Sequence, residues 1–240
     1  MVSVRGRPFP AVLFSHGSGH ATGVDASGRP DQRHPELLAP VFVLHGYAFL
    51  YLFRRGDGLS RGQGTPAGDL MDREFTQNGQ EGRNKIQLHL MESDEIDDVL
   101  AGLSFLRSLP EIDRNRIALV GHSFGASLTI LAAERDKNVK AAVVFSAGGY
   151  SWDRSSLLRI RLLSAVGNIS VPIFLIHAAN DYSVIPGKVL AAELERVKKP
   201  QRLKIYPATG QTTDDGHDFI HREMAIWEPD VFKFLDEYTR

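Results

Sequence analysis

Ser123 is the residue whose sequence surroundings best fit a catalytic nucleophile. It is the centre of Gly121-His122-Ser123-Phe124-Gly125, which follows the apolar run Ile117–Val120 and precedes a stretch with helical spacing. A tight turn between a strand and a helix presents a serine hydroxyl at a helix N-terminus, where backbone N–H groups favour negative charge. The flanking glycines remove side chains that would collide as strand and helix approach. The pattern predicts a serine nucleophile, and its alternative is an ordinary glycine-rich turn.

A second Gly-x-Ser-x-Gly pattern surrounds Ser60. It continues into Gln63-Gly64-Thr65-Pro66-Ala67-Gly68, where we expect no helix to start. Without a following helix, the backbone N–H groups that a nucleophile needs are missing. We therefore expect Ser60 to lie on a solvated loop.

A histidine base must accompany the serine, because a serine hydroxyl is a weak nucleophile at neutral pH. The Gly-x-Ser-x-Gly turn resembles the nucleophile turn of a known hydrolase fold, and this resemblance implies that the acid and then the histidine follow the serine along the chain. His217 lies in a polar turn after the last apolar run and is the predicted base, with His221 as the alternative and a surface histidine as the inert interpretation. His177 ends an apolar run, so we expect it to pack in the interior or behind the site.

Asp181 is the predicted acid that orients His217. It comes directly after the run that ends at His177, where a carboxylate at the end of a strand can reach the imidazole. Its competitors are Asp214, Asp215 and Asp153. The doublet beside His217 is expected to cap the turn instead.

Two backbone N–H groups are predicted to form an oxyanion hole. One belongs to Phe124, the residue after the nucleophile, and the other to Ser18, in the glycine-containing loop 16–20 that follows the apolar run Ala11–Ser15. The two histidines of that loop lack a nearby set of carboxylates, so we expect no metal site.

The elements that must position these residues follow from the hydrophobic pattern. Short β-rich runs occur at Ala11–Ser15, Tyr47–Phe53, Ile117–Val120, Val139–Phe145, Ile173–Ile176 and Leu203–Tyr206. Helical spacing is found around residues 96–106, after 123, at 189–197 and at 226–235, the last interrupted near Pro229. This alternation predicts an α/β fold with a mostly parallel sheet, helices on both faces and a site at the carboxyl ends of the strands.

Two segments interrupt the alternation, residues 54–84 and 148–168. Both follow strand ends, so we expect them to be functional or mobile loops, or a cap, that overhang the site. No stretch has the composition of a linker, which indicates a single domain over residues 1–240.

The composition excludes several classes of protein. The chain has 240 residues, a net charge of −1 and no cysteine. These values argue against nucleic-acid and membrane-surface partners and exclude disulfides and thiol nucleophiles. The longest apolar run, Pro40–Phe53, is too broken to span a bilayer, and Met1–Arg7 lacks the pattern of a signal peptide, so we expect a soluble, cytoplasmic protein.

Together these residues resemble the α/β-hydrolase superfamily, and within it dienelactone-hydrolase-like esterases and the catalytic domains of prolyl-oligopeptidase-type peptidases. The matching segments are 15–19, 46–48, 55–62, 113–125, 177–184 and 216–219. Two features depart from these families: the cysteine nucleophile of dienelactone hydrolases proper is absent, and we expect no propeller domain within these 240 residues. The usual antiparallel strands before the first oxyanion strand are missing or reduced to Val2–Arg5.

The resemblance implies a cofactor-free serine hydrolase that cleaves a small-molecule carboxylic ester through an acyl-enzyme, as a monomer or homodimer. Trp152, Tyr182 and Phe219 are candidate pocket walls, and plain core packing is the alternative for each. An amide- or peptide-directed hydrolase of the same fold is the second hypothesis. A non-catalytic binding module is the third, and perhydrolysis by the same three residues also fits the sequence.

Overall fold

Six parallel strands form one sheet in the part of the chain that the computed structural model describes, residues 8–24 and 34–240. Their order across the sheet is β2-β1-β3-β4-β5-β6, and every pairing is parallel. The strands are β1 (Phe9–Ser15), β2 (Ala48–Leu52), β3 (Ile112–His122), β4 (Ala141–Phe145), β5 (Ile173–Ala178) and β6 (Gln201–Tyr206). Each predicted β-rich run forms one of them, which confirms the predicted parallel sheet.

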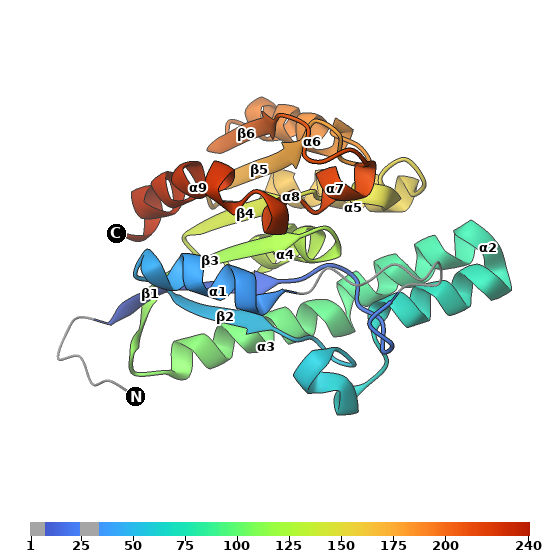
Figure 1. The fold of residues 1–240 in the computed structure, drawn as a ribbon, viewed down its shortest axis with the longest axis horizontal. Helices are drawn as coiled ribbons and strands as arrows, with labels where there is room; N and C mark the ends of the chain where they lie inside the picture. The colour runs from blue at the N-terminus through green and yellow to red at the C-terminus, as the bar shows by residue number, and fades with distance from the viewer. Residues whose placement is uncertain (1–7, 25–33) are drawn as a thin grey trace.

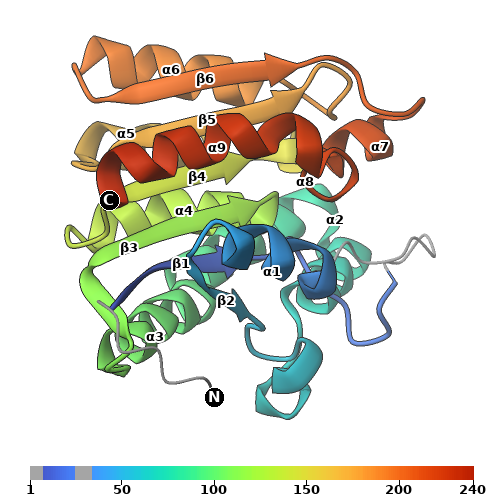
Figure 2. The same ribbon diagram turned by 60° about the vertical axis from the view of Figure 1, so that its left-hand side comes forward.

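The central strands β1, β4 and β5 and the second half of β3 are mostly apolar and buried, because helices cover both faces of the sheet. Alternate residues of β1 belong to two separate core clusters: Ala11 and Leu13 pack on one face, and Val12 and Phe14 pack on the other. Figure 2 shows the two layers of helices on either side of the strands. One layer contains α3 (Asp94–Ser108), α4 (Phe124–Arg135), α5 (Ser156–Asn168) and α6 (Ile185–Arg196); the other contains α1 (Pro35–Leu44) and α9 (Met224–Thr239).

Segment 54–84 is mostly helical, which corrects the predicted loop. After the short 3₁₀ turn η1 (Gly58–Gln63), helix α2 (Ala67–Glu92) begins directly behind Pro66, so the expectation that no helix starts there is wrong. The helix reverses at Gly79, whose φ of 65° and ψ of −161° are readily accessible to glycine. Figure 1 shows the two arms of α2 projecting from one end of the molecule.

Segment 148–168 also forms regular structure instead of a long loop. A short 3₁₀ turn, η2 (Gly149–Ser151), leads to α5, whose first turn is capped by the Ser155 hydroxyl accepting from the Leu158 N–H at 3.2 Å. Serine at this position stabilises a helix start by satisfying an otherwise unpaired N–H.

The C-terminal segment is one helix where an interruption is predicted. Helix α9 runs through Pro229 because Trp227, Val231 and Phe234 on the same helix are all buried against the sheet. Two short helices precede it, α7 (Thr213–His217) and α8 (Phe219–Arg222). The possible early strand Val2–Arg5 lies outside the described residues. Among the helices that the structure describes, none is long and apolar enough to cross a membrane.

Candidate active site

Ser123 lies in a strained turn between β3 and α4. Its φ is 56° and its ψ is −116°, a conformation that residues other than glycine rarely adopt. The Ser123 N–H donates to the carbonyl of Phe145 at 2.9 Å, and the Ser123 carbonyl accepts from the N–H of Ser127. Strain of this kind is typical of functional sites, where the surrounding structure holds it in place.

The two glycines of the turn are required by close backbone contacts. A Cβ at Gly125 would lie 2.0 Å from the carbonyl oxygen of Ser15 and 2.3 Å from that of His16. A Cβ at Gly121 would lie 2.3 Å from the hydroxyl oxygen of Thr129. Any side chain here would push α4 away from the sheet, and Ser123 with it.

The structure brings Ser123, His217 and Asp181 into one hydrogen-bonded chain. His217 Nε2 lies 2.9 Å from Ser123 Oγ, and His217 Nδ1 lies 2.7 Å from Asp181 Oδ1. The three residues follow β3, β6 and β5, so they meet at the carboxyl edge of the sheet. Because a carboxylate only accepts, Nδ1 of neutral His217 carries the proton and Nε2 is free to accept one from the serine.

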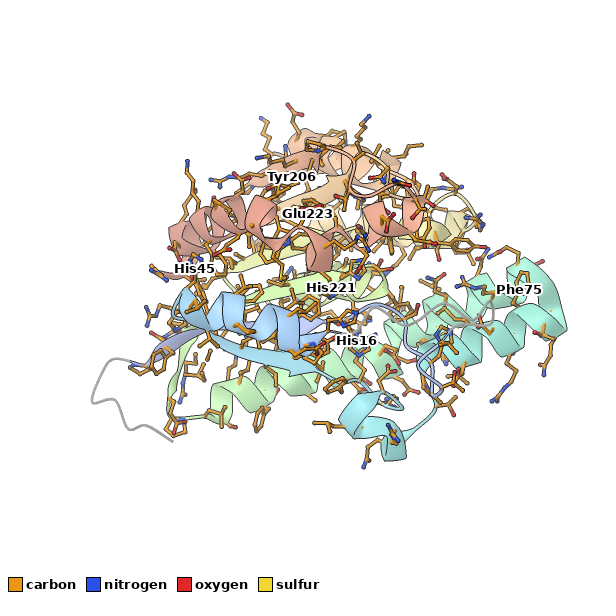
Figure 3. The ribbon with its side chains drawn as sticks, viewed as in Figure 1. His16, His45, Phe75, Tyr206, His221 and Glu223 are labelled. Atoms are coloured by element: carbon orange, nitrogen blue, oxygen red, sulfur yellow. The ribbon has the colours of Figure 1, made fainter. Side chains whose placement is uncertain are left out.

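His217 ends the short helix α7, where the sequence predicts a turn. The helix begins with a capping box in which the Thr212 hydroxyl accepts from the Asp215 N–H and the Asp215 carboxylate accepts from the Thr212 N–H. Asp215 therefore caps this segment, as expected, whereas Asp214 accepts from the Tyr182 hydroxyl instead. The alternative base, His221, pairs with Asp218 at 2.6 Å, and its ring lies beneath α8 (Figure 3).

Asp181 is surrounded by hydrogen-bond donors. Oδ1 also accepts from the Tyr182 N–H at 2.7 Å, and Oδ2 accepts from Nδ1 of His177 at 2.8 Å. Burial disfavours the charged form, but the hydrogen bonds from both histidines, and the positive charge that His217 carries when it takes up a proton, outweigh it. They hold the pKa of the Asp181 carboxyl below its usual range, so it remains ionised at neutral pH.

Two buried histidines support the site in ways that the sequence analysis does not specify. His177 orients Asp181, and its place four residues before the acid is the available sequence signal. His122 Nε2 donates to the backbone carbonyl of His217 at 2.8 Å. Burial, followed by the charges of His217 and His221, lowers the pKa of His122 well below its usual range, so the ring is a neutral donor.

The loop after β1 lies directly beside the nucleophile. A Cβ on Gly17 would be 3.6 Å from the Ser123 Cβ, and Ser18 follows at the same bend, half-buried. Phe124 starts α4 on the opposite side of Ser123 and is 5% exposed. The loop and the helix start are therefore where the predicted oxyanion donors, the N–H groups of Ser18 and Phe124, must lie.

The three aromatic residues considered as pocket walls separate into two groups. The half-buried Tyr182 has its ring centre 4.5 Å from that of His217, and its hydroxyl donates to Asp214. Trp152 and Phe219 are each 2% exposed and pack in the two core clusters, which leaves them no surface for a substrate. Core packing, the alternative interpretation of both residues, replaces the pocket role.

Ser60 and Arg54, in and beside the 3₁₀ turn η1, are more buried than expected for a loop. Ser60 lies in η1 instead of on a solvated loop; it is half-buried, and its hydroxyl donates to the carbonyl of Phe53 at 2.8 Å, a structural bond. Arg54, the first residue of the segment 54–84 that is expected to form a loop or a cap, is fully buried. The described residues include no group of three or more histidine, aspartate and glutamate side chains that could hold a metal ion.

Comparison with known proteins identifies the chain's relatives. The model of the dienelactone hydrolase family matches residues 59–228. No curated protein matches the chain significantly.

Several solved structures have the same fold at low sequence identity. The Pyrococcus furiosus esterase Pf2001 is 18% identical, with a TM-score of 0.66 over 97% of this chain and 82% of the esterase. The Pyrococcus horikoshii acylaminoacyl peptidase is 18% identical, with a TM-score of 0.64 over 98% of this chain and 38% of the peptidase. Dipeptidyl peptidase 4 of Porphyromonas gingivalis is 18% identical, with a TM-score of 0.62 over 97% of this chain and 31% of the peptidase. These likenesses show an α/β-hydrolase fold.

Proposed function

Because the chain belongs to the dienelactone hydrolase family, we propose that it is a serine hydrolase that cleaves small-molecule carboxylic esters through an acyl-enzyme. Family membership supports a hydrolase, and the fold is shared with esterases and peptidases. One observation carries the assignment of the residues. The contacts of His217 with Ser123 at 2.9 Å and with Asp181 at 2.7 Å form the relay that activates a serine hydroxyl.

The first half of the proposed reaction acylates Ser123. His217 Nε2 takes the hydroxyl proton as Ser123 Oγ bonds to the ester carbonyl carbon, and the carbonyl oxygen becomes an oxyanion. The carbon–oxygen bond to the alcohol then breaks, and the alcohol leaves with the proton from His217. Asp181 stabilises the imidazolium between these steps and keeps the imidazole in the tautomer that accepts at Nε2.

The second half regenerates the enzyme. A water molecule gives a proton to His217 and attacks the acyl carbon, and the acid leaves as Ser123 Oγ recovers the proton. In both halves the N–H groups of Ser18 and Phe124 stabilise the oxyanion, and each such donor contributes roughly 3 to 4 kcal/mol in enzymes of this type. None of these steps uses a cofactor.

An activity panel with matched variants tests the proposal. We expect p-nitrophenyl acetate and butyrate to be hydrolysed by the unmodified protein. Ser123→Ala should lose about 10⁴-fold or more in kcat, because the acyl-enzyme cannot form. Ser60→Ala, which removes the other serine of the same sequence pattern, should retain activity. Equal loss in both variants, or none in Ser123→Ala, would contradict the assignment.

Aminoacyl p-nitroanilides in the same panel address the bond that is cleaved. The reaction with an amide uses the same serine, but His217 must protonate a poorer, amine leaving group. We expect the esters to have the higher kcat/KM at matched acyl groups. If the anilides were cleaved more efficiently, the enzyme would be an amide-directed hydrolase that uses the same three residues.

A further inference from the structure

Arg54 is a fully buried cation that the proposed reaction does not use. It follows β2, and its partner Glu95, from α3, is only 1% exposed. The Arg54 Nε donates to Glu95 Oε2 at 2.5 Å. A buried ion pair contributes little to stability on balance, because taking both charges out of water offsets their attraction. The pair therefore calls for an explanation other than stability.

The other nitrogens of Arg54 bind the loop beside the nucleophile. Nη1 donates to the Ser15 hydroxyl at 2.9 Å and to the His16 carbonyl at 2.9 Å. Nη2 donates to the Gly17 carbonyl at 2.7 Å. Figure 3 shows His16 at the end of β1, where this loop begins. Two successive carbonyls are thus held by one rigid guanidinium group.

Holding these carbonyls also sets the direction of the N–H groups on the same peptides. A trans peptide is planar, with its C=O and N–H pointing in opposite directions. The Gly17 carbonyl and the Ser18 N–H belong to one peptide, so a carbonyl fixed on Arg54 turns the Ser18 N–H away from Arg54. His16 Nδ1 donates to the same Gly17 carbonyl at 2.8 Å, which restrains the peptide further.

The same guanidinium also contacts the second predicted donor residue. Its Cζ lies 5.4 Å from the centre of the Phe124 ring, a cation–π distance. Arg54 therefore bridges the β1 loop and the start of α4, the two elements between which the oxyanion must sit. Oxyanion stabilisation depends on donors that are already aimed before the reaction begins.

We propose that Arg54, held by Glu95, is a positioning residue that fixes the Ser18 N–H and the Phe124 backbone as an oxyanion hole. The proposal rests on the proposed serine hydrolase function. Arginine is required because its planar fork can bind Glu95 and several oxygens of the loop at once. Lysine, a single point charge on a flexible stem, cannot hold Glu95 and both carbonyls together.

Arg54→Lys and Glu95→Gln test the proposal, with Arg55→Lys and Asp98→Asn as matched controls. Arg55 is the next residue, but its side chain pairs with Asp98 and Asp94 on the same helix α3, with Nη2 2.7 Å from Asp98 Oδ1. The readouts are kcat and KM for an ester, the same constants for its thionoester, and the thermal unfolding midpoint. Sulfur is a weak hydrogen-bond acceptor, so the ester-to-thionoester ratio of kcat/KM reports on the oxyanion donors.

We expect Arg54→Lys to lower kcat for the ester by roughly 10- to 100-fold, less than the loss of a whole donor, with KM within about threefold. The ester-to-thionoester ratio should fall about tenfold in Arg54→Lys, and by a smaller factor in Glu95→Gln. Both control variants should keep the wild-type ratio.

The proposal would be overturned if folded Arg54→Lys kept the wild-type ester-to-thionoester ratio, even if its activity and thermal stability declined. It would also be overturned if the ratio fell equally in the two control variants. If Arg54→Lys does not fold, the nearly isosteric Glu95→Gln decides by the same ratio. Failure of the underlying function is recognised separately, because Ser123→Ala would then retain esterase activity.

Discussion

Replacement of Asp181 by asparagine removes a charge from the site without forcing the wrong histidine tautomer. Oδ1 accepts from both His217 Nδ1 and the Tyr182 N–H, whereas Oδ2 accepts from His177 Nδ1. An asparagine that places its oxygen at the Oδ1 position keeps the first two bonds. Its NH₂ group then faces His177, which can move its proton to Nε2.

The expected loss of activity therefore comes only from the lost attraction between the Asp181 carboxylate and the imidazolium of His217. A carboxylate and an imidazolium whose charge centres are about 4 Å apart attract each other by about 4 kcal/mol at an effective dielectric constant near 20. Water and the retained hydrogen bonds reduce this amount. We expect kcat/KM to fall by roughly 10²- to 10³-fold, compared with the roughly 10⁴-fold loss when the orienting amide imposes the wrong tautomer.

The assay is steady-state hydrolysis of p-nitrophenyl acetate by Asp181→Asn, with Asp214→Asn as the control. Asp214 is the competing carboxylate near His217 and binds the Tyr182 hydroxyl, so its variant should stay within about threefold of wild type. A loss below tenfold in Asp181→Asn would show that Asp181 does not support His217. A loss of 10⁴-fold or more would show that the asparagine turns its NH₂ group toward His217.

Gly125→Ala, compared with Gly62→Ala, and His122→Gln test the support around the site. Gly125→Ala should destabilise the fold by about 3 kcal/mol in urea unfolding, because its Cβ would lie 2.0 Å from a backbone oxygen. Gly62→Ala, which has open space around its Cβ, should change stability by less than about 0.5 kcal/mol, and equal effects would refute the steric argument. Because the pKa of His122 is lowered in the folded protein, the unfolded chain binds more protons than the folded one below the ordinary histidine pKa of about 6.5. The contribution of His122 to the free energy of unfolding is therefore fully present above that pH and is lost as the pH falls. His122→Gln should reduce the slope of unfolding free energy between pH 6.5 and 5 by up to about 1.4 kcal/mol per pH unit; an unchanged slope would contradict neutral burial of His122.

Most of the sheet could be predicted from sequence because its central strands β1, β3, β4 and β5 are buried on both faces where they pair. Each of these strands contains a short apolar run with its own boundaries, and the residues after β3, β5 and β6 must meet at one edge. Topology thus places Ser123, Asp181 and His217 near one another without knowledge of any side-chain contact. The distances of 2.9 and 2.7 Å come only from the structure.

The parts that the sequence analysis missed have no distinct hydrophobic pattern of their own. Helix α2 is polar over much of its length, and its arms project so that Phe75 is 51% exposed (Figure 3). Helix α1 contains Pro40, and its apolar residues merge with those of β2 into one run. Arg54 and Glu95 are 41 residues apart, so neither residue's neighbours in sequence indicate their contact.

Covalent labelling by a fluorophosphonate tests the central claim most directly, because the reagent reacts with a serine hydroxyl only when a base activates it. The account predicts one adduct per chain, located by peptide mass spectrometry at Ser123, absent in Ser123→Ala and retained in Ser60→Ala. No adduct on the folded protein, or an adduct that persists in Ser123→Ala, would contradict it.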